Sequence, residues 1–511
     1  MSPQVETTPL PSAPSPSTWA SDFGMLAAVA AATIVAQLLL GSRFGFHRDE
    51  LATLDDARHL AWGYVAYPPI TPLFGRLSLI LFGKSLSGFR FFSNVAEAVV
   101  VVLTGLMARD LGGRRGAQLV AAAAAIPFCL AGGALMQYVS FDYLCWVLAA
   151  YFVVRLLQTE DQRWWLAIGA AIGFGMLTKY TMGFFALGIV AGVLLTNTRR
   201  HLTSKWLWIG VGLSVLIFLP NLLWQAQHHF ISLDFLKHIH ERDVRIGRTK
   251  DFLPDQLKLT LLAAPLWIAG LYFYLISKQG QRFRMLGWMY IVPLLLFIVA
   301  KGRGYYLAAA YPMLYAAGSV WGEQRLSSLS KFWAGCLRAL VRAALVADIV
   351  MVGAIVLPPT PVNSPLWKFA SERNGDLFEE LGWPELVQTV AQIRDTLPAE
   401  DRAHLAVLAG NYGEAGAINL YGPAYGLPPA ISGINSFYER GYGNPPPETL
   451  IVLGLSREFL DSTFTSCQVA GHTPNPYAIH NEETSDHPDI YVCRGLRQPW
   501  PDFWKTFRYY G

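Results

Sequence analysis

Two adjacent carboxylates, Asp49 and Glu50, have the residue type and the position in the chain to carry out acid–base chemistry. They follow an apolar segment at 25–40 by a few residues, inside a long loop at 42–90 that is too apolar for a simple linker. A carboxylate held near a membrane surface can take a proton from a hydroxyl group. The alternative is a pair of solvated acids at a helix end. We favour Asp49, with Glu50 as its rival, because adjacent helical residues point in different directions.

Basic and aromatic side chains gather in the segment KGRGYYLAAAYP at 301–312. One interpretation is a phosphate clamp at the membrane interface, since Lys and Arg bind phosphate and glycine lets the backbone approach a ligand. The other is an ordinary interface of snorkelling basic residues and an aromatic belt. The candidate donor-binding residues of this segment are Lys301, Arg303, Tyr305 and Tyr306.

A second long loop, 226–258, is rich in histidine, lysine and arginine. Arg242 and Arg245 in this loop form either a cationic face for an anionic head group or the solvated side of an amphipathic helix. Its His-x-His pair lacks a carboxylate at a fixed spacing, so the sequence does not indicate a metal site, although a divalent metal is left open. We therefore expect no metal ligands and no cofactor.

Single charges stand beside two other apolar segments. Asp142 follows MQYVSF, and Lys179 lies within MLTKYTMG. Each could cap a helix. We expect both on the same membrane face as Asp49, where they could line one cavity together with Tyr67, Pro68 and Pro69 from the first loop.

The composition is that of a membrane protein. Of the 511 residues, 53% are hydrophobic and 15% charged, against about 25% charged in typical soluble domains. The 40 basic and 36 acidic residues give a net charge of +4 without a basic run, which argues against nucleic-acid binding. Apolar runs predict about eleven membrane-spanning helices between 23 and 357, and an interfacial stretch at 70–83.

The short connections indicate the orientation of these spans. Those at 109–116, 155–163, 196–205, 278–284 and 325–342 all carry Arg or Lys, whereas those near 136–141 and 179 are nearly bare. Positive residues favour the cytoplasmic side. We therefore expect the N-terminus in the cytoplasm, and both long loops and the C-terminal segment outside it.

The two ends of the chain differ from the apolar middle. Residues 1–22 are rich in Pro, Ser and Thr and predict a disordered tail. Residues 358–511 have ordinary polarity, and strand, helix and strand patterns at HLAVLAG (404–410), NYGEAGAINLYG and TLIVLG (449–454) predict a small α/β domain. Its two cysteines, Cys467 and Cys493, are expected to form a disulfide if this domain lies in an oxidising compartment.

Several motifs in series resemble glycosyltransferase family 39, which includes the protein O-mannosyltransferases and the aminoarabinose lipid A transferases. They are the DE pair, the Pro-Pro motif with the FG that follows it, Asp142, GMLTKYTMG, PNLLWQ (220–225) and KGRGYYLAAAYP, which together cover most of 20–325. The chain departs from the aminoarabinose transferases in having Tyr67-Pro68-Pro69 where they have Lys-Pro-Pro, so a phosphate-contacting lysine is missing there.

The resemblance implies a multi-span GT-C fold and a site on the non-cytoplasmic face of the bacterial inner membrane. It implies a polyprenyl-phosphate sugar as donor, a hydroxyl or phosphate on an envelope lipid or protein as acceptor, and Asp49 as the catalytic carboxylate. Lys301, Tyr305 and Tyr306 fall in the donor-binding region. A transporter of anionic polyprenyl-linked lipids is the alternative, although the hydropathy pattern has no matching halves. A membrane scaffold is a third, which would leave the loop carboxylates without a role.

Overall fold

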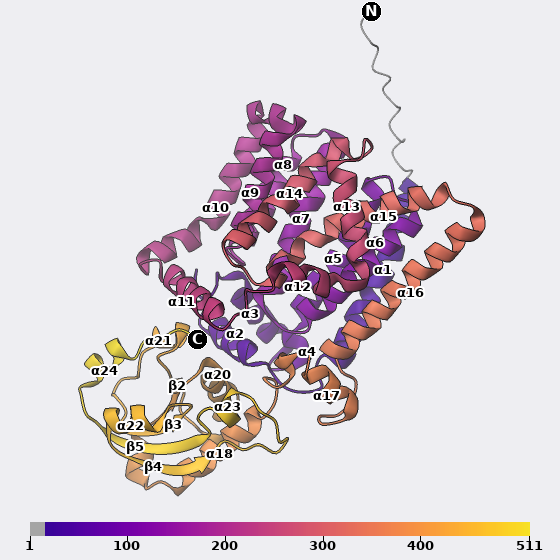
Figure 1. Cartoon of the computed structure of the whole chain (residues 1–511). Coiled ribbons are helices and arrows are strands. Elements are labelled where there is room, and N and C mark those ends of the chain that lie inside the picture. Colours follow the sequence, from indigo (N-terminus) through magenta and orange to yellow (C-terminus); the bar gives the residue numbers. More distant parts are fainter. Residues whose placement is uncertain (1–15) are drawn as a thin grey trace, which may run out of the picture.

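The chain folds into a helical bundle and a smaller α/β domain at one end of it (Figure 1). The computed structural model describes residues 16–511, with side chains from residue 19 onward. Of the expected disordered tail, residues 1–15 lie outside the described residues. The expectation was wrong for 16–22, which form the first turns of helix α1 (Pro16–Leu40). Asp22 accepts a hydrogen bond from Arg115 and lies 3.3 Å from Arg109, which ties this end of α1 to the bundle.

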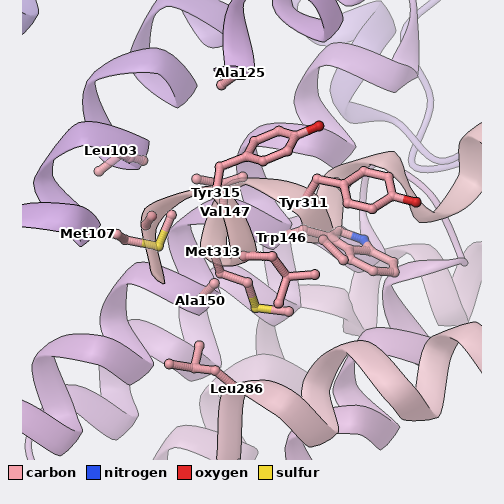
Figure 2. Close-up of a cluster of buried hydrophobic side chains, with 14 of the residues drawn as sticks. Leu103, Met107, Ala125, Trp146, Val147, Ala150, Leu286, Tyr311, Met313 and Tyr315 are labelled. Atoms are coloured by element: carbon pink, nitrogen blue, oxygen red, sulfur yellow. The ribbon is translucent and has the colours of Figure 1, made fainter. Parts of the chain in front are cut away.

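The bundle contains the helices expected from the apolar runs. After α1 they are α5 (Phe91–Asp110), α6 (Arg115–Gly133), α7 (Tyr138–Thr159), α8 (Trp164–Met176), α9 (Met182–Leu195), α10 (Lys205–Gln227), α13 (Ala264–Leu275), α14 (Arg284–Val299), α15 (Tyr311–Ser327) and α16 (Lys331–Val356). Figure 2 shows the core where α5, α6, α7, α14 and α15 meet around Trp146, Tyr311 and Tyr315. By contrast, α10 and α16 turn large apolar side chains outward, as a surface in contact with lipid requires.

The expected number of spans is not confirmed. Within the described residues, eight helices are long and apolar enough to cross a membrane, or nine if α9 and the short helix η1 (Asn197–Thr203), bent by 100°, form one broken span. Helix α8 has only 13 residues, about 20 Å at 1.5 Å per residue, which is short of the bilayer core. Helix α15 ends in the polar run 322–325. Apolar runs therefore located the helices, and the number of spans stays a prediction.

Short helices from the two long loops lie at the end of the bundle that faces the α/β domain (Figure 1). The first loop forms α2 (Arg48–Arg58), α3 (Ile70–Phe82) and α4 (Leu86–Phe89). The second forms α11 (Ile231–Arg245) and α12 (Phe252–Thr260). The 3-10 helices of this region and of the remaining bundle connections are η2 (Leu261–Ala263), η3 (Gln281–Phe283) and η4 (Gly304–Ala310).

The C-terminal domain is built on a five-stranded sheet of order β2-β1-β3-β5-β4. Strands β1 (Leu405–Ala409), β2 (Ala430–Ile431) and β3 (Thr449–Leu453) are parallel, while β5 (Asp489–Leu496) runs antiparallel to β3 and to β4 (Phe464–His472). The strand–helix–strand unit expected from the sequence is β1, α20 (Tyr412–Tyr421) and β3. Cys467 on β4 and Cys493 on β5 are cross-strand partners and are joined by a disulfide.

Further helices surround the sheet and connect it to α16. They are α17 (Pro365–Ser371), η5 (Gly375–Leu377), α18 (Trp383–Thr396), α19 (Ala399–Ala403), η6 (Gly422–Tyr425), α21 (Asn435–Tyr438), α22 (Arg457–Thr463), α23 (Glu482–Ser485) and α24 (Trp500–Thr506). Helix α20 packs directly on α2: a Cβ atom on Gly416 would lie 2.7 Å from the Leu51 backbone. The domain is thereby fixed against the helix that carries Asp49.

Candidate active site

The start of helix α2 determines where Asp49 points. His47 is the N-cap residue: its Nδ1 accepts a hydrogen bond of 3.1 Å from the Asp49 backbone N–H. Glu50 completes the capping box, because its Oε2 accepts from the His47 backbone N–H at 3.0 Å. Asp49 therefore lies in the first turn of a well-anchored helix, at the surface of a cavity.

Both carboxylate oxygens of Asp49 are held in place. The side-chain amide of Gln137, just before α7, donates to Oδ2 at 2.9 Å. The phenol of Tyr412, at the start of α20, donates to Oδ1 at 2.8 Å. The carboxylate is therefore oriented by one residue from the bundle and one from the C-terminal domain. Neither Gln137 nor Tyr412 is predicted from the sequence as a site residue.

Glu50 has a structural role. Its side chain is fully buried and accepts hydrogen bonds from Arg90 at 2.8 and 2.5 Å and from the Met136 backbone N–H at 2.8 Å. Arg90 also lies 3.3 Å from Glu380. Glu50 is outside the cavity lining, so its place as a rival catalytic residue is corrected: only one of the two neighbouring acids faces the cavity.

The cavity that holds Asp49 has a volume of about 990 Å³ and lies between the bundle and the C-terminal domain. The bundle contributes the start of α2, the Pro-Pro loop, the segments before α7 and before α9, and one side of α11. The C-terminal domain contributes residues from η5, α20, α21, α23 and the last residues of the chain. Its polar lining residues include His47, Arg48, Asp49, Gln137, Lys179, Arg242, Arg248, Arg303, Asp376, Glu379, Asn411 and Glu482.

Lys179 enters this cavity inside a cage of tyrosines. Its Nζ lies 4.1 Å from the ring centre of Tyr306, 5.0 Å from that of Tyr138 and 5.4 Å from that of Tyr305. Within the described residues, no carboxylate lies within salt-bridge distance of Lys179. Aromatic faces stabilise the ammonium without neutralising it. The charge therefore stays available to an anionic ligand.

Three arginines of the lining share one acid, Asp243 on α11. Arg303 makes a bidentate pair with it at 2.6 and 2.9 Å, while Arg242 and Arg248 lie 3.9 Å away. Burial lowers the pKa of Arg303, whereas the nearby Asp243 carboxylate raises it. The net shift of the Arg303 pKa is upward, so the guanidinium stays charged. Three cations around one anion leave this side of the cavity positive.

Several residues proposed from the sequence lie outside the cavity lining. Lys301 is exposed to solvent, at a positive φ of 46° between α14 and η4, and its place is taken by Lys179. Arg245 is exposed outside the lining, and Arg248 of the same loop lines the cavity instead. Pro69 lies behind Tyr67 and Pro68 as the N-cap of α3. Tyr305 contributes through the cage around Lys179.

Asp142 also lies outside the lining and acts on the loop that carries Lys179. It is 6% exposed, and it accepts hydrogen bonds from Trp146 at 3.0 Å and from Thr181 at 3.2 Å. The Thr181 contact fixes the turn between α8 and α9. Asp142 therefore supports the turn that carries Lys179 and does not face the cavity.

The Pro-Pro loop is tied to α2 through Tyr67. The Tyr67 phenol donates a hydrogen bond of 2.6 Å to Asp56, one of two acids that Arg440 of the C-terminal domain also binds. Burial raises the pKa of Asp56 to about 6, although Arg440 and Tyr67 oppose the shift. Tyr67, which stands where the aminoarabinose transferases have a lysine, thus joins the Pro-Pro loop, α2 and the C-terminal domain. Asp55 and Asp56 are therefore domain contacts.

No metal site is evident among residues 16–511, where no three His, Cys, Asp or Glu side chains are grouped closely enough to hold an ion. The charged side chains that line the cavity include Asp49, Lys179, Arg242, Arg248 and Arg303.

Comparison with known proteins gives a consistent set of matches. Residues 66–224 match the family of dolichyl-phosphate-mannose-protein mannosyltransferases. The chain is 27% identical over 180 residues to the lipid A galacturonosyltransferase RgtD of Rhizobium johnstonii, covering 33% of this chain and 37% of that protein. It is 26% identical over 311 residues to undecaprenyl phosphate-alpha-4-amino-4-deoxy-L-arabinose arabinosyl transferase 1 of Pseudomonas fluorescens, covering 56% and 55%. The chain thus spans about a third to about half of these relatives.

The fold is also similar to a solved structure. The crystal structure of ArnT from Cupriavidus metallidurans bound to undecaprenyl phosphate matches 94% of this chain and 98% of that chain, with a TM-score of 0.56 and 15% identity. The fold is that of the GT-C membrane glycosyltransferases. Within this class, the chain is related to the bacterial members of the family 39 type, as the motifs predicted, and that recognition is confirmed.

Proposed function

We propose that the chain transfers a sugar from a polyprenyl-phosphate donor to an acceptor in the cell envelope. The observation that carries this proposal is that Asp49, held at both oxygens, lines the same cavity as Lys179, Arg242 and Arg303. A base and a phosphate-binding group in one cavity are the two parts that such a transfer needs. The matched relatives, a lipid A galacturonosyltransferase and an undecaprenyl-phosphate aminoarabinose transferase, support it. Both are transferases, which favours transfer over lipid transport.

In the proposed reaction, Asp49 accepts the proton of an acceptor hydroxyl while the hydroxyl oxygen attacks the anomeric carbon of the sugar. The bond from that carbon to the phosphate oxygen breaks, and its electron pair leaves with the polyprenyl phosphate. Lys179, Arg242 and Arg303 stabilise the negative charge that develops on the leaving phosphate. Gln137 and Tyr412 hold the Asp49 carboxylate so that it needs no reorientation during the step.

We also propose that the cavity and the C-terminal domain lie outside the cytoplasm. The basic short connections support this orientation, because the positive-inside rule places them in the cytoplasm. Helix α16 runs the length of the bundle and joins these connections to the C-terminal domain at the other end (Figure 1). The disulfide between Cys467 and Cys493 is in keeping with an oxidising compartment.

The proposal is tested on purified protein in lipid nanodiscs. Retention of undecaprenyl phosphate is measured by native mass spectrometry, and transfer is measured with the lipid-linked sugars extracted from the membranes that hold the protein. In native mass spectrometry, we expect undecaprenyl phosphate to stay bound to the purified protein. In the transfer assay, we expect free polyprenyl phosphate to form from the lipid-linked sugar only when an acceptor is present. Movement of the lipid-linked sugar across the bilayer without release of its sugar would contradict the proposal and favour the transporter.

A further inference from the structure

Two groups of charged residues with opposite sign line the cavity, apart from Asp56, which pairs with Arg440. The first is the phosphate-binding group already described, with Lys179, Arg242 and Arg303. The second, the acidic group, comprises His47, Arg48, Asp376, Glu379 and Glu482. Its members contact one another: Arg48 lies 2.5 Å from Glu482 and 3.8 Å from Glu379, and His47 lies 3.9 Å from Asp376.

The acidic group has an excess of negative charge. Together with Asp49, it sets four carboxyl groups against the single guanidinium of Arg48. Burial, with the neighbouring acids, raises the pKa of Glu379 to about 7, so this side chain is partly protonated near neutral pH. At least two uncompensated negative charges remain. A phosphate group at this side would be repelled, whereas a hydroxyl group would not.

His47 has a donor that the protein leaves without a partner. Its Nδ1 accepts the Asp49 backbone N–H, which puts the proton of the neutral ring on Nε2. The residue is only 4% exposed, and its Nε2 has no hydrogen-bond partner within the described part of the chain. Oε2 of Glu379 also lacks a hydrogen bond. An unsatisfied donor and an unsatisfied acceptor in one cavity wall suit sugar hydroxyls, which both accept and donate hydrogen bonds.

We propose that the acidic group is the acceptor subsite, and that it binds the uncharged saccharide head group of a glycolipid, with His47 Nε2–H donating to one of its oxygens. This inference rests on the proposed function. The apolar residues Leu236 and Ile239 of α11 and Ile246, which follows the helix, line the same cavity, and Ile246 is more than half exposed. A head group bound here can keep its acyl chains in the membrane, which favours a lipid over a protein acceptor.

The test compares two lipids with identical acyl chains on protein in nanodiscs already loaded with undecaprenyl phosphate. Monoglucosyl diacylglycerol and phosphatidic acid are titrated separately, and the bound fraction is measured by native mass spectrometry. We expect the glycolipid to bind at least ~10-fold more tightly, the factor that one net hydrogen bond of about 1.4 kcal/mol provides. A preference for phosphatidic acid, or no preference, would overturn the inference.

The variant His47→Ser isolates the donor. It keeps the helix cap and turns the box into Ser-x-x-Glu, so a purely structural role of His47 predicts unchanged binding. We expect glycolipid affinity to fall by ~10-fold while loading with undecaprenyl phosphate is unchanged. The matched control is Glu458→Gln, an exposed acid of the C-terminal domain outside the cavity, which should bind as the wild type does.

Two results would count against the inference. Wild-type glycolipid binding in His47→Ser would remove His47 from the subsite, and displacement of the glycolipid by a Ser/Thr-rich peptide would assign the subsite to a protein acceptor. Failure of undecaprenyl phosphate to load contradicts the proposed function itself. Intact loading without the glycolipid preference overturns only the acceptor subsite.

Discussion

Tyr412 of the C-terminal domain donates a hydrogen bond of 2.8 Å to Asp49, a residue that lies 363 positions earlier in the chain. The same phenol ring stacks under the guanidinium of Arg48 at 4.7 Å. Because Asp49 has its other oxygen bound by Gln137, the C-terminal domain completes the support of the carboxylate. This domain is thus a part of the proposed active site, rather than an appendage to the bundle.

Tyr412→Phe should slow transfer without weakening donor binding. The substitution removes one hydroxyl and keeps the ring against Arg48, so Asp49 loses one of its two side-chain partners. We expect kcat to fall by ~10-fold, the effect of about 1.4 kcal/mol, with KM for the donor unchanged. Steady-state kinetics measures both, and Tyr425→Phe, an exposed tyrosine of the same domain, is the control. A rise in KM with kcat unchanged would mean that Tyr412 binds substrate instead.

Lys179→Met should weaken binding of undecaprenyl phosphate. The ammonium in the tyrosine cage has no acid within salt-bridge distance among the described residues, so its loss removes a charge-assisted contact to phosphate. We expect a ~10-fold or greater loss of affinity, measured by native mass spectrometry. Lys301→Met is the matched control, because Lys301 is exposed and outside the cavity lining. Equal losses in both variants would contradict this assignment.

The comparison of Lys301 with Lys179 shows what the sequence could predict. The sequence predicts Lys301 as a donor-binding residue because it stands in a motif with Arg303 and two tyrosines, and this motif reaches the cavity through Arg303 and Tyr306. A sequence motif does not indicate which of its side chains faces the cavity. Lys301 takes a positive φ at the end of α14 and faces solvent, whereas the turn that Asp142 fixes brings Lys179 to the same tyrosines.

The position of Asp49 could be predicted because it follows the first apolar segment by only a few residues. Such a short separation can be read directly from the local pattern of the sequence. Gln137 and Tyr412 were missed because their contacts with Asp49 span 88 and 363 residues, and no periodicity reports such contacts. Likewise, apolar runs located the helices, but they do not fix the number of spans, because α8 has only 13 residues and α15 ends in polar residues.

Stability should fall between pH 6 and pH 8.5. Burial raises the pKa of Glu380 to about 8 and that of Glu414 to about 8, both above the unfolded value near 4.5. The folded state therefore binds more protons than the unfolded state between about pH 4.5 and pH 8, and this stabilisation is lost as pH rises through that window. Melting temperatures at the two pH values check it.

The variant Glu414→Gln keeps an acceptor for the Gly410 and Asn411 backbone N–H groups and cannot ionise. It should reduce the difference in melting temperature between pH 6 and pH 8.5. The account of this pH dependence fails if the variant and the wild type lose the same amount of stability, or if the wild type is more stable at pH 8.5.

Cys467 and Cys493 should resist alkylation in the unreduced protein. Protein from native membranes, denatured without reductant and treated with a maleimide, should be labelled at three cysteines and at five after reduction. The matching test of orientation is a periplasmic reporter fused after Gly511, which should be active. Labelling of all five cysteines without reductant would contradict the disulfide, and activity of a cytoplasmic reporter alone would place the C-terminal domain on the cytoplasmic side.

The most direct test of the central claim is single-turnover transfer by Asp49→Asn. Asparagine keeps the shape and removes the proton acceptor, so transfer should fall by ~100-fold or more while undecaprenyl phosphate is retained as in the wild type. Glu50→Gln should instead lower the melting temperature, because Arg90 loses one of its two buried carboxylate partners, and should keep transfer in the folded fraction. Transfer near the wild-type rate in Asp49→Asn would contradict the claim that this carboxylate is the base.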